Sequence, residues 1–507
     1  MPNDPTPPRP KGAAATLVHP PRPPVPGRTL VLAACLMATF MAAVESTIVA
    51  TAMPTVVADL GGFNLFSWIF AIYLLTQAVT IPVYGRLADI YGRKRVFYVG
   101  AGLFLTGSTL CGFAPNMIWL IIFRALQGCG AGGVQPIAMT ICGDIYAPAE
   151  RAKVQGAISS VFGVAAVAGP SLGAWLVEHA AWQVVFWVNL PIGAAAIAMI
   201  AAFLHENVGR RPHRIDTLGS LLLAVGIGAL MLVLIQRTDF DRLTTVAIAL
   251  GGVLALTALL LHERRTAEPM LVFSLLRERV ILIGSVGSGL AGAVMMGISA
   301  FLPAYVQGAM GQSAIMAGLV LGAMSVTWAL ASIFGGRLMV RTTYRLAAVT
   351  GAVALIAGCA MLVLLTPARG VPWATAGSLI IGVGMGFCNT AFIVSIQAAV
   401  AWNRRGAATS WCLFLRFIGQ AIGAASFGAV LNATIAARAP GSAHMLDQLL
   451  EPAQRAALPE AERSGLIELV AAGLHNAYWL GLVLSIAALL LVMALPARLS
   501  PAQQTLR

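Results

Sequence analysis

The chain contains 507 residues, of which 59% are hydrophobic and only 10% are charged. This composition excludes a soluble globular protein, because too few polar side chains remain to cover its surface. The formal net charge is +13 at pH 7, a value that in other proteins can indicate nucleic-acid binding. Here the basic residues are distributed loop by loop and do not form one face with interleaved aromatic residues, so we expect no nucleic-acid partner.

Proline dominates the first segment of the chain. Ten prolines occur between Pro2 and Pro26, and the stretch lacks the apolar core of a signal peptide. We therefore expect residues 1–29 to form a disordered cytoplasmic tail. A second, short cytoplasmic tail is expected at residues 497–507.

Fourteen hydrophobic stretches of membrane-spanning length follow the tail. Crossing about 30 Å of hydrocarbon takes about 20 helical residues at a rise of 1.5 Å each. By this criterion the sequence predicts spans near residues 30–52, 66–85, 97–113, 117–140, 154–177, 182–204, 217–236, 243–261, 280–306, 314–334, 346–365, 372–396, 408–432 and 475–495. The chain is thus expected to be an all-α polytopic membrane protein with the lipid bilayer as its solvent.

The basic residues predict the orientation of these spans. An even number of spans places both termini on the same side of the membrane. Of the 32 lysine and arginine residues, 24 lie in the tails and connections that share the side of the N-terminus. The positive-inside rule then places both termini in the cytoplasm. The expected location is the cell membrane, inner or plasma.

The first span carries an acidic residue, Glu45. A carboxylate costs free energy in hydrocarbon whether it is charged or neutral, so it persists there mainly where it binds a proton or a cation. Arg124 in the fourth span lies at a similar depth, about 10 Å from the outer end by the helical rise. We expect Glu45 and Arg124 to pair, or to communicate through Gln127, and favour a functional relation over a purely structural ion pair.

The connection between the second and third spans contains a short basic motif, Gly85-Arg-Leu-Ala-Asp89-Ile-Tyr-Gly92-Arg93. Gly85 and Gly92 would let the helices end and turn sharply, and Asp89 can face the N-terminus of a neighbouring helix. A loop that only sets the topology is the alternative. The order of residues resembles the signature loop of the major facilitator superfamily, which implies that these four residues constrain conformational switching.

Three further motifs carry the same resemblance. The fourth span contains the family pattern Arg124-x-x-Gln127-Gly, although the family generally has aspartate where this chain has Glu45. Gly169-Pro170-Ser-Leu-Gly173 in the fifth span is close to an element that distinguishes antiporters, and Pro170 can bend the helix at a gate. Residues 182–193 closely resemble the Trp-x-x-x-Phe-Trp-x-Asn-x-Pro-x-Gly run of the fourteen-span drug:proton antiporter group.

A weak internal repeat predicts the domain organisation. Pairing spans 1–6 with spans 9–14 aligns two sets of basic connections and leaves spans 7 and 8 as an insertion. We expect a six-helix bundle at 30–204, two inserted helices with their loops at 205–279, and a second six-helix bundle at 280–496, with a site between the bundles near the midplane. The outward loop 433–474 is expected to be a solvated helical flap in preference to a substrate lid.

Polar and aromatic residues inside the spans are candidates for a substrate path. Arg416 and Gln420 form a second intramembrane polar pair, for which helix packing and substrate contact are equally good interpretations. The other candidates, chosen for polarity or aromaticity alone, are Trp68, Tyr73, Gln77, Phe392 and Gln397. The seven cysteines lie in apolar segments without a Cys-x-x-Cys pair and are interpreted as packing residues, so no metal site is expected.

Together these features suggest a proton-coupled secondary transporter. The resemblance implies export of hydrophobic or cationic compounds by alternating access. Glu45 would take up a proton from outside, where burial favours its neutral form, and release it inside after the switch. The expected partners are protons and a small hydrophobic or cationic substrate, with a periplasmic adaptor and an outer-membrane channel as further candidates.

Two alternatives stay open at this point. The same fold would suit an exporter of one specific metabolite or siderophore. A non-transporting membrane receptor or scaffold belongs to a different class, and it would not require Glu45 to titrate. The sequence has no phosphate-binding Gly-x-x-x-x-Gly-Lys-Ser/Thr run and no evident nucleophile with its base, so we expect neither an enzyme nor a cofactor.

Overall fold

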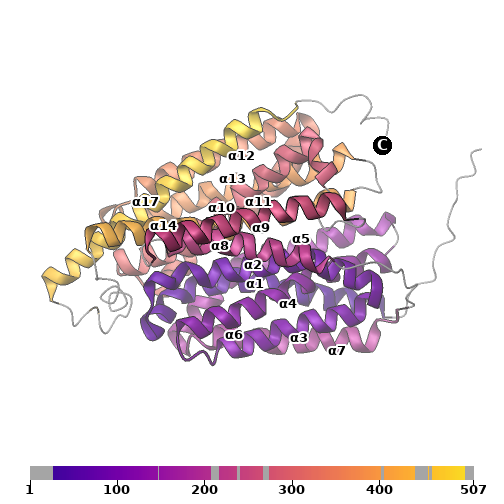
Figure 1. The fold of residues 1–507 in the computed structure, drawn as a ribbon, viewed down its shortest axis with the longest axis horizontal. Helices are drawn as coiled ribbons and strands as arrows, with labels where there is room; N and C mark the ends of the chain where they lie inside the picture. The colour runs from indigo at the N-terminus through magenta and orange to yellow at the C-terminus, as the bar shows by residue number, and fades with distance from the viewer. Residues whose placement is uncertain are drawn as a thin grey trace, which may run out of the picture.

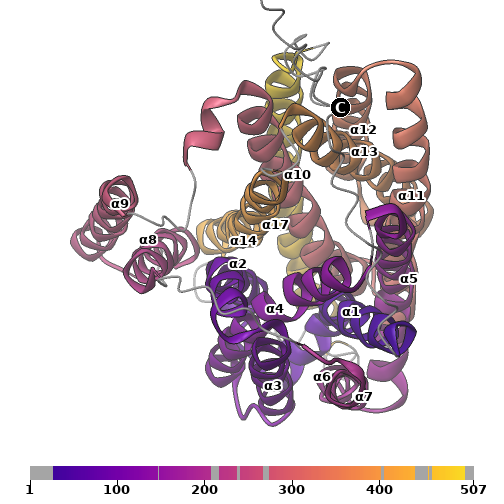
Figure 2. The same ribbon diagram turned by 90° about the vertical axis from the view of Figure 1, so that its right-hand side faces the viewer.

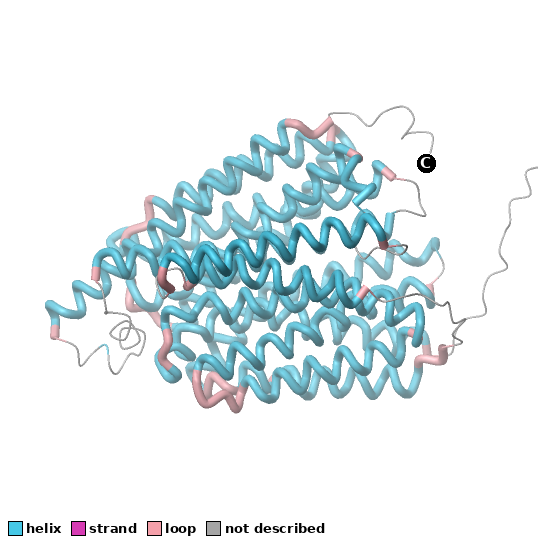
Figure 3. Tube along the Cα trace, in the orientation of Figure 1, coloured by secondary structure: helices cyan, strands magenta, loops and turns pink. Residues whose placement is uncertain are grey.

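The computed structural model describes residues 27–146, 148–206, 216–236, 240–266, 273–400, 405–439, 455 and 459–496. These residues are helical apart from short connections, and no strand occurs among them (Figure 3). Nearly all of the predicted N-terminal tail and all of the predicted C-terminal tail lie outside the described residues. The predicted all-α class is confirmed.

Each predicted span corresponds to helical structure. The first half contains α1 (Arg28–Leu60), α2 (Phe66–Tyr91), α3 (Arg93–Cys111), α4 (Met117–Ile145), α5 (Pro148–His179), α6 (Val184–Trp187) and α7 (Asn189–Phe203). The insertion contains α8 (Thr217–Ile235) and α9 (Arg242–Arg265). The second half contains α10 (Arg279–Ala304), α11 (Ala314–Arg341), α12 (Tyr344–Val363), α13 (Gly370–Ala399), α14 (Arg405–Arg438) and α17 (Glu460–Met493). Short helical turns are η1 (Phe63–Leu65), η2 (Phe273–Arg277), η3 (Tyr305–Ala309) and η4 (Pro367–Arg369).

Twelve helical segments within the described residues are long and apolar enough to cross a membrane. Helices α3 and α5 are not among these twelve, although both coincide with predicted spans and pack against α4 and α1 respectively. The chain is therefore a multi-pass helical membrane protein, whereas the number of fourteen spans stays a prediction.

Several helices extend beyond the predicted spans. Helix α2 continues through Gly85 to Tyr91, α14 continues to Arg438, and α17 begins at Glu460. Both described ends of the predicted loop 433–474 are therefore helical. The added turn of α14 contains alanines, which favour a helix, and α17 starts with Glu460 and Glu462 in its first turn, where they complement the helix dipole.

The two halves repeat the same helix pairings. In the first half α1 packs against α5, α2 against α4 and α3 against α4. In the second half the corresponding pairs are α10 with α14, α11 with α13 and α12 with α13. Figure 1 shows the two halves as two layers of roughly parallel helices, with the first half in indigo and magenta and the second in orange and yellow. This repetition supports the internal duplication inferred from the connections.

The halves contact each other through two equivalent pairs of helices. Helix α5 packs against α11, and α2 packs against α14. The inserted helices α8 and α9 pair with each other at the side of the molecule, where α8 contacts α2 and α14 (Figure 2). The insertion thus covers one of the two seams between the halves.

Polar contacts join the halves at the end where α1 ends and α2 begins. The Asn432 side-chain amide donates to the backbone oxygen of Asn64 at 2.8 Å. The Glu178 carboxylate on α5 accepts a hydrogen bond of 2.9 Å from the backbone N–H of Ile315, at the N-terminus of α11. With the orientation that the basic residues predict, this is the outer end, so these contacts close the molecule toward the outside.

We predict that Glu178→Ala weakens this closure. Removing a carboxylate from a helix N-terminus costs about 1 kcal/mol, which corresponds to a roughly fivefold population shift. A disulfide between Asn64→Cys and Asn432→Cys should then form more slowly in membranes than it does without the Glu178 substitution. His179→Ala is a matched control, because the His179 ring forms a hydrogen bond with the backbone oxygen of Trp175 and stacks on its ring, both within α5. An unchanged cross-linking rate in Glu178→Ala would contradict the assignment.

Candidate functional site

A buried polar cluster surrounds Glu45 in the middle of α1. One carboxylate oxygen accepts a hydrogen bond from Nη1 of Arg124 on α4, and the two residues form an ion pair. The other oxygen accepts a hydrogen bond of 2.5 Å from Nδ2 of Asn189 at the start of α7. The exposed fractions are 0% for Glu45, 1% for Arg124 and 1% for Asn189. The carboxylate is thus enclosed by protein on all sides.

The guanidinium of Arg124 has additional partners. Its Nη1 donates to Oε1 of Gln127 at 2.7 Å, and its Nε donates to the backbone oxygen of Ile69 at 3.2 Å. The guanidinium carbon also lies 4.1 Å from the ring centroid of Tyr73. An arginine keeps its charge in any protein environment, and acceptors together with an aromatic face stabilise that charge. Arg124 can therefore remain in place if Glu45 becomes neutral.

Ser108 of α3 connects the members of the cluster. Its hydroxyl accepts hydrogen bonds of 3.1 Å from the side-chain amides of both Gln127 and Asn189, and donates to the backbone oxygen of Phe186 at 2.7 Å. The close approach of α3 to α4 requires glycine at position 107, where a Cβ atom would lie 2.5 Å from the backbone nitrogen of Gln127. The side chains of the network thereby come from four helices of the first half, α1, α3, α4 and α7, and its backbone acceptors come from α2 and α6.

The structure brings Glu45, Arg124 and Gln127 together, as the depth of the residues suggested. Sequence reasoning missed Asn189 and Ser108. Asn189 lies in the motif at 182–193, which was noted without a role for its amide. Ser108 follows a glycine in an apolar helix, and no signal in the sequence marks it.

The residues expected to govern switching occupy two places. At the α2–α3 junction, Gly92 has a φ of 90°, which favours glycine, while Gly85 lies inside α2 and does not end it. Arg93 forms an ion pair of 3.0 Å with Asp144 at the end of α4. The backbone of Asp89 belongs to the last turn of α2, and its side chain lies outside the described part of the structure.

The second place is the C-terminal half of α5, which packs against α1 of the first half and α11 of the second. A Cβ atom at Gly169 would overlap Oγ1 of Thr47, two residues after Glu45 in α1. A Cβ atom at Gly173 would lie 2.6 Å from the backbone oxygen of Ile48. On the other side, a Cβ atom at Gly318 of α11 would lie 2.6 Å from the backbone oxygen of Pro170. The Gly-Pro-x-x-Gly element therefore lies between the helix that carries Glu45 and the opposite half.

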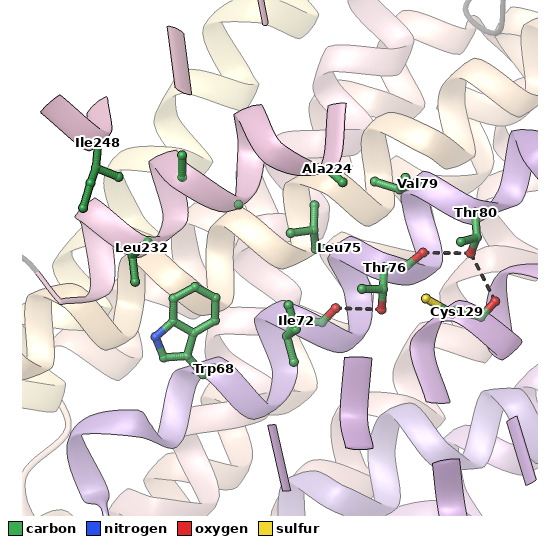
Figure 4. A pocket seen from close by; sticks show the side chains of 12 residues that line it. Trp68, Ile72, Leu75, Thr76, Val79, Thr80, Cys129, Ala224, Leu232 and Ile248 are labelled. Carbon is green, nitrogen blue, oxygen red and sulfur yellow. Dashed lines mark hydrogen bonds between the residues drawn. The ribbon is translucent and has the colours of Figure 1, made fainter. Parts of the chain in front are cut away.

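The substrate-path candidates of the first half do not form one site. Tyr73 belongs to the Arg124 cluster, and Gln77 is buried in α2. Trp68 instead lines an apolar pocket of about 390 Å³ between the first half and the inserted helices (Figure 4). Its wall is formed by residues of α2, α4, α8 and α9, namely Trp68, Ile72, Leu75, Thr76, Val79, Thr80, Cys129, Ala224, Gly228, Ala229, Leu232 and Ile248.

The candidates of the second half lie on α13 and α14. Arg416 donates from Nη1 to Oδ1 of Asn389 at 3.1 Å, and Gln397 donates to Oγ1 of Thr409 at 3.2 Å. Both contacts join α13 to α14. Gln420 is buried against α10, and Phe392 is buried within the second half. Arg416 and Gln420 therefore lie in the second half, separate from the Glu45 cluster.

The fold and the buried ion pair are those of a helical membrane carrier, and comparison with known proteins identifies the family. Residues 35–424 match the Major Facilitator Superfamily. The chain is 34% identical over 412 residues to the multidrug transporter protein MdtP of Bacillus subtilis (strain 168), covering 80% of this chain and 76% of that protein. It is 34% identical over 398 residues to multidrug resistance protein 3 of the same organism, with 78% of each chain covered. The chain belongs to the Major Facilitator Superfamily.

A solved structure supports the fold independently. A bacterial homologue of the human lysosomal transporter Spinster, in an inward-facing and unoccupied conformation, superimposes with a TM-score of 0.68 at 18% sequence identity. The superposition covers 94% of this chain and 99% of that chain. The expected family and the expected class, a membrane transporter instead of an enzyme, are therefore confirmed.

We predict strong coupling between Glu45 and Arg124 in protein stability. Arg124→Met alone should lower the free energy of unfolding by about 3–5 kcal/mol, because it leaves a buried carboxylate without its cation. Adding Glu45→Gln should restore a large part of that loss. Thermal unfolding of the purified protein in detergent, measured for both single variants and the double variant, gives the coupling energy. Additive effects of the two substitutions would show that the pair does not act as a unit.

Proposed function

We propose that the protein is a proton-coupled secondary transporter that exports small hydrophobic compounds by alternating access between its two halves. The observation that carries the proposal is the enclosed carboxylate of Glu45, which shares hydrogen bonds with Arg124 and Asn189. An ionisable residue inside a membrane protein is usually functional, and a lone carboxylate in a carrier is suited to binding a proton. The names of the bacterial relatives support drugs as the class of substrate.

Asn189 can form a hydrogen bond with Glu45 in both the charged and the protonated state of the carboxyl group. When Glu45 is charged, the amide nitrogen of Asn189 donates to the carboxylate. When Glu45 is protonated, it becomes a hydrogen-bond donor and needs an acceptor. The Oδ1 atom of Asn189 has no hydrogen-bond partner among the described residues, and a rotation of the amide would present it to the acid. Arg124 then retains Gln127, the Ile69 carbonyl and the Tyr73 ring.

The contacts of α5 suggest how protonation reaches the opposite half. Neutralising Glu45 removes its charge attraction to Arg124, which frees α1 to shift against α4. Any shift of α1 would displace Gly169 and Gly173 of α5, because the backbone of both residues is in direct contact with α1. Pro170 of the same element touches Gly318 of α11. Through these close contacts, protonation of Glu45 would change the packing of α5 against α11 at the seam between the halves.

The direction of transport follows from the predicted orientation. With both termini in the cytoplasm and the outer end closed, we assign the structure to the state that would load substrate from inside. Glu45 is charged in this state, having released its proton to the cytoplasm. After the outer end opens, a proton from outside would neutralise Glu45 and promote release of the substrate. The inward proton gradient then drives export.

We predict that Glu45→Gln abolishes export driven by a pH gradient. Glutamine keeps the size and hydrogen bonds of a neutral Glu45 but cannot exchange a proton, so uptake of a fluorescent drug into inverted vesicles should no longer respond to the gradient. Exchange of labelled for unlabelled substrate without a gradient should persist, because it needs no net proton movement. Glu45→Asp is the matched control and should retain part of the response. Gradient-driven uptake at the normal rate in Glu45→Gln would refute the proposed role.

A further inference from the structure

Arg416 places a positive charge deep in the second half of the protein. It lies about three turns into α14. Its Nη1 atom donates to the neutral side chain of Asn389, and among the described residues no carboxylate forms an ion pair with it. The other intramembrane arginine, Arg124, is neutralised by Glu45. Arg416 therefore gives the interior an excess positive charge.

The guanidinium of Arg416 is only partly satisfied. An arginine carries five N–H donors and cannot shed its proton. Asn389 accepts from one nitrogen, and Nε has no hydrogen-bond partner among the described residues. The side chain is also partly exposed, whereas its neighbours Cys412 and Gln420 are buried. A residue that served only to hold helices together would be expected to use its donors within the protein.

In the described part of the chain, the surroundings of Arg416 provide donors and apolar surface but no carboxylate in an ion pair with it. Ser288 of α10 interacts with the thiol of Cys412, one turn before Arg416. Gly292 of the same helix lets α10 pack closely against α14, since a Cβ atom there would lie 2.8 Å from the backbone oxygen of Arg416 and 3.2 Å from its Cγ. Phe417 supplies aromatic surface next to the guanidinium. Such a combination is suited to a planar anion attached to a hydrophobic body.

We propose that Arg416 recognises an anionic group, such as a carboxylate or sulfonate, on the exported compound. The substrates would then be hydrophobic acids and not the cations that the resemblance suggested. This inference rests on the proposed export function and names the chemical class of its substrate. A cation at the same place would face Arg416 without a neutralising carboxylate, so the site discriminates by repulsion as well as by attraction.

Export of a monoanion in exchange for a proton would move net charge across the membrane. If one proton enters for each monoanion that leaves, each cycle moves the equivalent of two positive charges inward. Exchange of one proton for one monovalent cation would move none. The membrane potential, negative inside, would therefore drive export of the acid even without a pH gradient.

Three matched fluorescent compounds test the proposal. These are pyrenebutyric acid, its methyl ester, and a pyrene that carries a trimethylammonium group. In inverted vesicles we expect the acid to be transported in preference to the ammonium compound, with a rate that depends on the membrane potential. Arg416→Gln should lower transport of the acid at least tenfold and leave transport of the ester within twofold. Arg416→Lys should retain part of the acid transport, because lysine keeps the positive charge but lacks the planar guanidinium that donates two parallel hydrogen bonds to an anion.

Two further measurements separate the possible outcomes. Arg369→Gln is a matched control, because Arg369 stacks on Trp373 at the start of α13, and this substitution should leave the acid-to-ester ratio unchanged. Binding of the acid to purified protein, followed by pyrene fluorescence, should weaken in Arg416→Gln. Equal losses for acid and ester would assign Arg416 a structural role and overturn the inference. Gradient-driven transport of the ammonium compound in preference to the acid would also overturn the inference about Arg416, but it would leave the proposed export function intact. Absence of transport for all three compounds would instead contradict the proposed export function.

Discussion

The ion pair between Glu45 and Arg124 is the interaction on which the rest of the structure depends. A single charge in hydrocarbon is costly, and two opposite charges become tolerable only when they are in contact and their remaining hydrogen-bonding groups are satisfied. Here Gln127 and the Ile69 carbonyl accept from Arg124, and Asn189 donates to Glu45. Ser108 in turn accepts from Gln127 and Asn189. These requirements fix the positions of α1, α3, α4 and α7 relative to one another, and so determine the packing of the first half.

The two halves have the same arrangement of helices but different buried polar residues. Their helices pair in the same order, and each seam is formed by equivalent helices. The first half contains an ion pair without net charge, and protonation of its carboxylate would leave the charge of Arg124 uncompensated. The second half contains Arg416 with a neutral partner, Asn389. The two halves thus repeat one helix arrangement and differ in their buried polar residues. In our proposal, the first half binds the proton and the second half binds the substrate.

The depth of residues in regular helices could be predicted from the sequence. Glu45 and Arg124 lie on spans whose ends are marked by hydropathy, and the fixed helical rise then places both at one depth. Gly92 could be predicted for a similar reason, because the change from one helix to the next needs a positive φ there. These features depend on local geometry, which the order of residues determines directly.

Features that depend on tertiary packing could not be predicted in the same way. Whether Asn189 reaches Glu45 depends on how α7 packs against α1, and the role of Ser108 depends on the approach of α3 to α4 permitted by Gly107. The pocket beside Trp68 exists only because α8 packs against α2 and α9 pairs with α8. The predicted spans of α2, α14 and α17 were too short because hydropathy marks the hydrocarbon boundary, whereas a helix continues as long as its backbone is favoured.

The central claim is that the protonation of Glu45 changes with the end of the molecule that is open. Infrared difference spectroscopy on membranes tests it by comparing protein held closed by a disulfide between Asn64→Cys and Asn432→Cys with the same protein after reduction at acidic pH. The account predicts that a protonated carboxylic acid band appears on release and is absent from the same comparison in a Glu45→Gln background. Identical spectra in the closed and released states would contradict it.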